Sequence, residues 1–243
     1  MVHALAGGLL AVLLPCNCVL CGARGPALLC PGCHAQFFGA GTPRCPVCAN
    51  PMAAAAHPAA MGLPCGRCQA APPAFDATLA AADYALPVDR LVLQLKFAGQ
   101  LALARLFAGL LGEAIARADA PARARPALLC PVPLGPQRLS ERGYNQSLEI
   151  ARPLGRQLGI AVHARLAVRV RDTPAQSSTP HGARRANIAH AFAIPDRALV
   201  AGRHIGLVDD VMSSGQTLQE LAATLKRHGA ARVTNYVFAR TPP

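Results

Sequence analysis

The chain has 243 residues and a formal net charge of +12, with 15% charged and 4% aromatic residues and no tryptophan. Hydrophobic residues make up 52% of it, which excludes an intrinsically disordered chain. This length suits one large domain or a small module joined to a medium one. The excess of positive charge indicates an anionic partner, such as nucleic acid, a membrane surface or a polyphosphate substrate, or simply a solubilising surface.

The distribution of cysteine and charge favours two domains. Eight cysteines lie between Cys18 and Cys68, in a part with only three Lys or Arg residues, and the acidic residues begin at Asp76. We predict one domain over residues 1–72 and another over residues 73–243, with its core at about residues 125–243. The second domain then carries the remaining +9 of the net charge.

The first residues contain an apolar stretch, residues 4–14, for which we predict an amphipathic helix. A basic segment before it and a small-residue cleavage site after it are both missing, so a secretory signal peptide is the weaker alternative. Eleven residues are fewer than the roughly 20 needed to span a bilayer, so we expect no stable membrane insertion. We therefore expect a cytoplasmic protein.

Four Cys-x-x-Cys pairs indicate metal binding. Each such turn directs two thiolates to one point and supplies half of a tetrahedral zinc site, whereas disulfides or a single redox pair would not explain four pairs. We predict two structural Zn²⁺ ions, with sequential or interleaved pairing of the half-sites. The predicted ligands are Cys18, Cys21, Cys30, Cys33, Cys45, Cys48, Cys65 and Cys68.

The zinc ions are expected to replace a hydrophobic core. A segment of about 70 residues with few large apolar side chains does not build a core alone. Eight thiolates and two zinc ions would leave this module with a charge of about −1, so the basic surface lies in the second domain.

The second domain alternates helix and strand patterns. Residues 91–112 have helical spacing interrupted at Gly99, and residues 146–158 and 218–228 also favour helices, the last two ending at glycines. The runs with strand character are residues 127–132, 160–170, 203–208 and 232–239. This alternation predicts an α/β fold, a mostly parallel sheet flanked by helices, with ligands beyond the carboxyl ends of the strands.

Residues 205–217, with the sequence IGLVDDVMSSGQT, contain the most specific pattern. A short apolar run delivers Asp209 and Asp210 at the end of a strand, and small polar residues then lead into a helix. Backbone amides, hydroxyls and the helix dipole form an anion pocket that suits a phosphate monoester. The two carboxylates suit sugar hydroxyls or a hydrated Mg²⁺ ion. An ordinary loop between strand and helix is the alternative.

Segment 205–217 resembles the phosphoribosyl pyrophosphate motif of the type I phosphoribosyltransferases. Three more segments agree: QLKFAGQ around Lys96, PVPLGPQRLSERGYNQ over residues 131–146 and AQSSTPHGARRANIAHAF over residues 175–192. Together with the cysteine pairs they resemble the ComF family, which joins a double zinc ribbon to a phosphoribosyltransferase domain. The resemblance implies the type I phosphoribosyltransferase fold and binding of phosphoribosyl pyrophosphate with Mg²⁺.

The resemblance also assigns roles to residues. It implies a catalytic group of Asp209, Asp210, Lys96 and Arg142, in which the two cations contact pyrophosphate, while Arg138 has the character of a surface charge. Residues 175–192 would form a lid, in which Ala183 replaces an acidic residue expected in the family. The implied substrate-binding residues are Val211, Met212, Ser213, Ser214, Gly215, Gln216, Thr217, Gln176, Arg184 and Asn187.

Two functions follow from the resemblance. In the first, the protein transfers a phosphoribosyl group to an unidentified acceptor. In the second, it is a non-catalytic accessory factor in DNA uptake or transformation, as the family's link with natural competence implies. There the basic domain contacts single-stranded DNA or other DNA-uptake proteins, although four per cent aromatic residues argue against strong base stacking.

Overall fold

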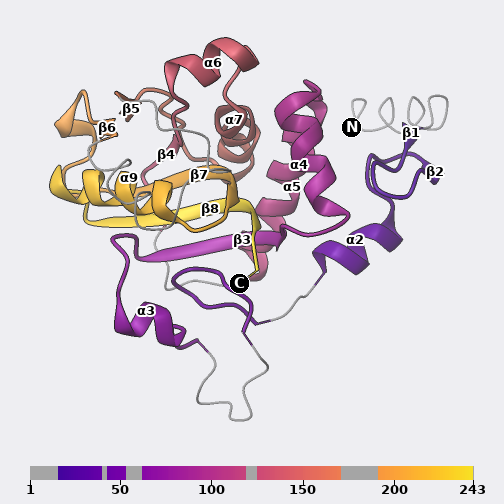
Figure 1. Cartoon of the computed structure of the whole chain (residues 1–243), viewed down its shortest axis with the longest axis horizontal. Coiled ribbons are helices and arrows are strands. Elements are labelled where there is room, and N and C mark those ends of the chain that lie inside the picture. Colours follow the sequence, from indigo (N-terminus) through magenta and orange to yellow (C-terminus); the bar gives the residue numbers. More distant parts are fainter. Residues whose placement is uncertain (1–15, 40–42, 53–61, 119–124, 171–190, 243) are drawn as a thin grey trace.

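The computed structural model describes residues 16–39, 43–52, 62–118, 125–170 and 191–242 (Figure 1). The amphipathic helix predicted over residues 4–14 lies outside these ranges. Within them, no helix combines the length and the apolar character needed to cross a membrane.

A four-stranded parallel sheet forms the centre of the protein, as predicted. Its strand order is β3 (Ala77–Asp83), β8 (Arg232–Arg240), β7 (His204–Met212) and β4 (Leu128–Pro131). Parallel pairing holds throughout, and it places the carboxyl ends of all four strands at the same edge of the sheet. Strand β3 is not anticipated by the sequence patterns, because its Ala-rich sequence has low β propensity.

Helices cover both faces of the sheet. Val208, Tyr236 and Phe238 share one buried cluster with residues of the helices on the first face, whereas Ile205 and Val233 share another with α9 (Gln216–Arg227). Figure 1 shows the first group of helices above the sheet. That group comprises α4 (Val88–Phe97), α5 (Ala102–Arg117) and α7 (Gln146–Leu158).

The remaining elements are short. The N-terminal part contains β1 (Cys16–Asn17), β2 (Arg24–Gly25), α2 (Pro31–Phe38) and α3 (Gly66–Ala70), and the later part adds α6 (Pro136–Arg142), β5 (Val168–Arg169), β6 (Phe192–Ala193) and the 3₁₀ turn Arg197–Leu199. The strand-like run at residues 160–170 was therefore over-predicted. A turn in which the Leu166 amide donates to the His163 carbonyl interrupts it, leaving β5 and a single bridge at Val162.

Capping residues set the helix boundaries that the sequence anticipates. The Asn145 side chain accepts a hydrogen bond from the Ser147 amide at the start of α7. Gly159, with φ of 67°, ends that helix, and Gly99, with φ of 64°, separates α4 from α5. The predicted ends of α7 and the division at Gly99 are thus confirmed, while α9 begins two residues before the expected Leu218.

Two groups of four cysteines lie in the N-terminal part. In each group the four Sγ atoms lie within 4.8 Å of one another, which is the spacing of a tetrahedral thiolate site. The first group is Cys18, Cys21, Cys30 and Cys33, and the second is Cys45, Cys48, Cys65 and Cys68. The pairing of half-sites is therefore sequential, and both groups fit zinc.

Backbone amides favour the thiolate form of one sulfur in each group, whereas burial raises the pKa of Cys33, Cys48 and Cys68. Burial raises the pKa of Cys18, but amide donors that include Cys21 and Cys30 outweigh burial and lower the pKa to about 6. Burial likewise raises the pKa of Cys45, and amide donors led by Cys65, whose N–H lies 3.2 Å from the sulfur, lower it to about 7. Low thiol pKa values favour the thiolate form that binds zinc.

The two cysteine groups belong to opposite faces of the sheet. Cys18 and Cys33 share a buried cluster with Phe38, whose ring packs 6.0 Å from Phe238, and Phe238 stacks on Phe107 at 3.6 Å. The second group shares the cluster that contains α9. Figure 1 shows β1 and β2 of the first cysteine segment on the side of α4 and α5, and α3 of the second segment beyond β3. The N-terminal segment thus completes the cores of both faces.

We expect metal analysis to find about two zinc ions per chain. Cys65→Ser removes one ligand of the second group and should reduce the content to about one, with a lower melting temperature because metal binding contributes to folding. Cys16→Ser is the matched control, since Cys16 lies outside both groups. A zinc content near zero in a fully folded wild-type protein would contradict a structural role for the metal.

Candidate functional site

Strand β7 carries two adjacent carboxylates into the interior. Asp209 is 9% exposed and Asp210 is 2% exposed. The sequence predicted these residues at the end of the strand, but the strand continues to Met212, because β7 stays paired with β8 as far as the Met212–Arg240 position. Both acids are consequently held by the sheet rather than by a loop.

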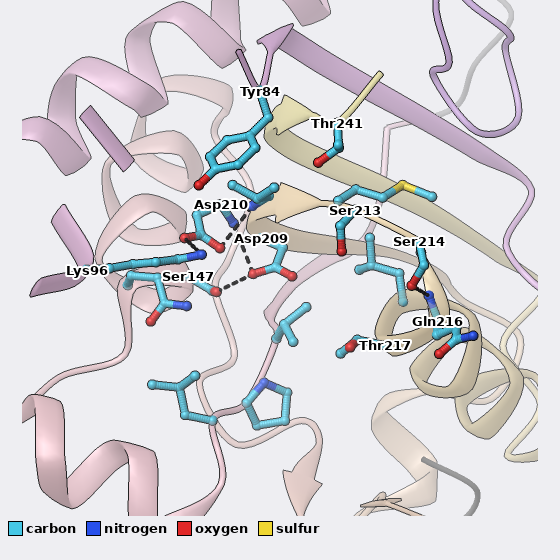
Figure 2. Close-up of a pocket in the computed structure, with 18 of the residues that line it drawn as sticks. Tyr84, Lys96, Ser147, Asp209, Asp210, Ser213, Ser214, Gln216, Thr217 and Thr241 are labelled. Atoms are coloured by element: carbon cyan, nitrogen blue, oxygen red, sulfur yellow. Dashed lines mark hydrogen bonds and ion pairs between the residues drawn. The ribbon is translucent and has the colours of Figure 1, made fainter. Parts of the chain in front are cut away.

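Two helices of the first face supply partners for these carboxylates. Lys96 on α4 places its Nζ 2.8 Å from Oδ2 of Asp210. Ser147 on α7 donates its hydroxyl to Oδ1 of Asp209 over 2.8 Å, and the Asp210 amide donates to the same oxygen over 3.0 Å. Figure 2 shows the other oxygen of Asp209 on the side of Ser213 and Thr217, facing the cavity.

The electrostatic balance of this group is incomplete. Burial, followed by the neighbouring Asp210 carboxylate, raises the pKa of Asp209 to about 7, against the lowering effects of Ser147 and Lys96. One ammonium group therefore faces two buried acids. A group with this balance attracts a further cation or hydroxyl donors.

The loop after β7 has the features of an anion site. Ser213 and Ser214 precede Gly215, whose φ of 79° orients the chain for the start of α9 at Gln216. A side chain at residue 215 would be strained by this φ, and its Cβ would lie 2.6 Å from Cε of Met212. The amides at the N-terminus of a helix point outward and favour a negative charge.

A cavity of about 270 Å³ joins the acids to this loop. One side holds Lys96, Ser147, Asp209 and Asp210, and the loop with α9 forms the other side (Figure 2). The structure brings together these predicted site residues: Lys96, Asp209, Asp210, Val211, Met212, Ser213, Ser214, Gly215, Gln216 and Thr217.

The arginines lie differently from the expectation. Arg138 lines the cavity, although the sequence favoured Arg142. Arg142 lies one helical turn further along α6, where its guanidinium is 5.4 Å from the centre of the Phe97 ring and donates to Gln146. Gln146 does line the cavity, so Arg142 reaches the site through that side chain.

Several lining residues were missed. Ser147 directly follows a quoted motif and could have been found there, whereas Tyr84, Arg169 and Thr241 carry no local signal. Three predicted residues, Gln176, Arg184 and Asn187, lie outside the described part of the chain.

The arrangement suits a sugar phosphate. Carboxylates accept hydrogen bonds from sugar hydroxyls, amides and hydroxyls of the loop bind a phosphate, and Lys96 and Arg138 supply positive charge along the same cavity. Such a site binds by charge placement and orientation, with little need for a nucleophilic side chain.

Comparisons with known proteins agree with this division of the chain. The double zinc ribbon domain matches residues 9–69, and the phosphoribosyl transferase domain matches residues 145–242. A hypoxanthine phosphoribosyl transferase of Trypanosoma cruzi is 15% identical and covers 59% of this chain and 76% of its own, but its TM-score of 0.36 is too low to support an argument.

Two full-length relatives are much more similar. DNA utilization protein YhgH of Salmonella typhimurium is 37% identical, over 81% of this chain and 84% of its own length. Competence protein F of Haemophilus influenzae is 30% identical, over 87% of this chain and 90% of its own length. With this coverage, two Cys₄ groups and a phosphoribosyltransferase domain, the chain belongs to the ComF family of these competence and DNA-utilization proteins.

Proposed function

We propose that this protein binds phosphoribosyl pyrophosphate with Mg²⁺ and transfers the phosphoribosyl group to an acceptor in the cytoplasm. The observation that carries the proposal is the single cavity in which Asp209 and Asp210 face the loop at Ser213 and Ser214. A ribose with a 5′-phosphate needs the carboxylates for its hydroxyls and the loop for its phosphate at the same time. We further propose residues 73–243 as the transferase domain, with the zinc ribbon ending near residue 72.

Each part of the substrate has a matching group. The loop amides and the hydroxyls of Ser213, Ser214 and Thr217 would bind the 5′-phosphate. Asp209 and Asp210 would accept the ribose hydroxyls, and Lys96 and Arg138 would contact the pyrophosphate. Arg142 has an indirect part, because it orients Gln146 from outside the cavity.

The donor set also fits Mg²⁺. This ion prefers carboxylate oxygens and retained water, and two neighbouring carboxylates with one ammonium partner leave negative charge for it. Asp209 and Asp210 would hold the ion, which, when bound, would neutralise charge on the pyrophosphate.

In the proposed reaction the bond between C1 of the ribose and the pyrophosphate oxygen breaks, and a bond from C1 to the acceptor forms. Pyrophosphate leaves with the bonding electron pair. Positive charge develops on the ribose beside the buried acids, while Lys96 and Arg138 face the leaving group. Placement of charge is therefore the catalytic contribution of this chain.

Calorimetry with phosphoribosyl pyrophosphate and Mg²⁺ tests the proposal. We expect millimolar or tighter binding to wild type and at least about 100-fold weaker binding to Asp209→Asn/Asp210→Asn, since charged hydrogen bonds contribute about 1.5–3 kcal/mol each. The control is Glu141→Ala, which removes an exposed acid on α6. If the folded wild-type protein shows no Mg²⁺-dependent binding at millimolar ligand, the proposed transferase function is excluded.

The pH dependence of binding should report Asp209. Its pKa of about 7 means that the carboxylate loses its charge as pH falls through 7, and the ligand and Mg²⁺ favour the charged form. Affinity should therefore weaken about tenfold from pH 8 to pH 6, beyond the change that Asp209→Asn shows from titration of the ligand itself. Identical pH profiles for the two proteins would contradict this role.

A second candidate function is binding of single-stranded DNA at the surface. The specific observation is Phe97, which is 75% exposed directly after Lys96 and carries the Arg142 guanidinium on its ring. An exposed aromatic ring with an arginine is a stacking surface for a base. The names of the two relatives refer to DNA utilization and competence.

Fluorescence anisotropy with a labelled oligonucleotide tests this second function. Affinity should fall steeply with salt, and Phe97→Ala should weaken binding about 5- to 100-fold, since a stacked base contributes about 1–3 kcal/mol, while the salt slope stays the same. The control is Leu86→Ala, another exposed apolar residue. A flat salt response, or equal affinity of the Phe97 variant, would remove the DNA function from this surface.

A further inference from the structure

Arg240 is a buried cation at the end of β8. Its residue is 4% exposed, and no carboxylate of the described residues forms an ion pair with it. The pKa of this guanidinium is lowered, and burial is the largest cause of that shift. The nearby sulfurs of Cys48 and Cys65 favour the charged form of Arg240. A buried charge also needs hydrogen bonds that replace its water, so the hydrogen bonds of Arg240 indicate its task.

The contacts of Arg240 are all backbone carbonyls. One terminal nitrogen, Nη1, donates to the carbonyls of Met212 over 2.9 Å and of Thr241 over 2.7 Å, and also to that of Ser213. The Nε atom donates to the Cys48 carbonyl over 3.0 Å. A single side chain therefore joins the second cysteine group to the loop that follows β7.

These contacts, together with the Thr241 amide that donates to the Met212 carbonyl over 3.0 Å, orient the amides of the loop. In a trans peptide the C=O and N–H groups point in opposite directions, and the carbonyls of Met212 and Ser213 share their peptide units with the amides of Ser213 and Ser214. With both carbonyls turned to Arg240, both amides point to the other side of the loop. That side is the cavity with Asp209, which Ser213 lines.

A second cavity, of about 510 Å³, lies on the Arg240 side of the loop, opposite the cavity with Asp209. Arg240 and Cys48 line this second cavity but not the first. The loop and the residues at its two ends form a wall between the cavities. Four of these residues line both cavities: Met212, Ser214, Gly215 and Gln216. Arg240 therefore supports residues 213–215, which we call the phosphate loop, from the side opposite the cavity with Asp209.

The other end of this connection rests on a constrained turn. Ala49, directly after Cys48, has φ of 56°, a left-handed conformation that is rare for alanine. Its amide donates to the Cys45 carbonyl, within the second cysteine group. Metal binding by Cys45 and Cys48 would hold this turn, and with it the Cys48 carbonyl, in place. The first cysteine group belongs to the cluster on the opposite face of the sheet.

We propose that Arg240 is a positioning residue that fixes the amides of the phosphate loop and couples metal binding at the second cysteine group to phosphate binding. The inference rests on the proposed function of the loop. It assigns the second zinc ion a role that the first does not share, namely support of the ligand site. Loss of the second ion should relax the turn at Ala49, release one donor contact of Arg240 and loosen the loop.

Binding of ribose 5-phosphate, which has only the sugar and the monoester, tests the proposal. Arg240→Met and Arg240→Lys should each bind at least about tenfold more weakly than wild type, because methionine lacks donors and a single ammonium cannot span both ends. Zinc content and cooperative thermal unfolding should persist. Wild-type affinity in either folded variant would overturn the positioning role.

The metal coupling is tested with one ligand variant in each group. Cys65→Ser should weaken ribose 5-phosphate binding about tenfold, and Cys21→Ser should change it less than about twofold. Combined with Arg240→Met, Cys65→Ser should add no further loss, because both changes interrupt the same connection. Equal effects of the two cysteine variants, or full additivity with Arg240→Met, would overturn the coupling.

Amide hydrogen exchange separates this inference from the proposed function. If wild type binds neither ribose 5-phosphate nor phosphoribosyl pyrophosphate at millimolar concentration, the proposed function fails. The coupling is then decided by exchange at residues 212–216, which should be faster in Arg240→Lys and Cys65→Ser than in wild type or Cys21→Ser. Unchanged exchange in Arg240→Lys and Cys65→Ser would overturn the coupling. This outcome does not require that Arg240→Met folds.

Discussion

Burial of two adjacent carboxylates in the central strand is the constraint on which the rest of this structure depends. Asp209 and Asp210 follow the last pair of β7 with β4, and side chains of α4 and α7 contact them, so they are only 9% and 2% exposed. Their charge has to be balanced from the helices above the sheet, by Lys96 of α4 and Ser147 of α7. The positions of these helices are therefore tied to the site as well as to the core.

The composition of the chain explains why it needs its cysteine-rich segment. Only 4% of the residues are aromatic, and one of the fully buried rings, Phe38, comes from the N-terminal part. It packs at a tilt against Phe238, which stacks on Phe107. The two cysteine groups take part in the buried clusters of opposite sheet faces. Removal of this segment would expose apolar surface on both faces, so the central sheet and its helices depend on it for burial.

Local chemistry explains what could be predicted. Asn145 and Gly159 mark both ends of α7 because capping depends on neighbouring residues, and the four Cys-x-x-Cys turns indicate metal sites for the same reason. Strand β3 was missed because only its pairing with β8 makes Ala-rich residues a strand. The contact between Arg240 and the Cys48 carbonyl spans 192 residues of sequence, and no local pattern predicts it.

The two candidate functions use different parts of the same region. A cavity of about 270 Å³ is near the lower end of the usual size for small-ligand sites, which admits a sugar phosphate rather than the middle of a polymer. Phe97 and Arg142 lie outside that cavity, beside its Lys96, and connect to it through Gln146. A DNA strand stacked on Phe97 would leave the loop at Ser213 and Ser214 accessible to a small ligand, so the two candidate functions are compatible.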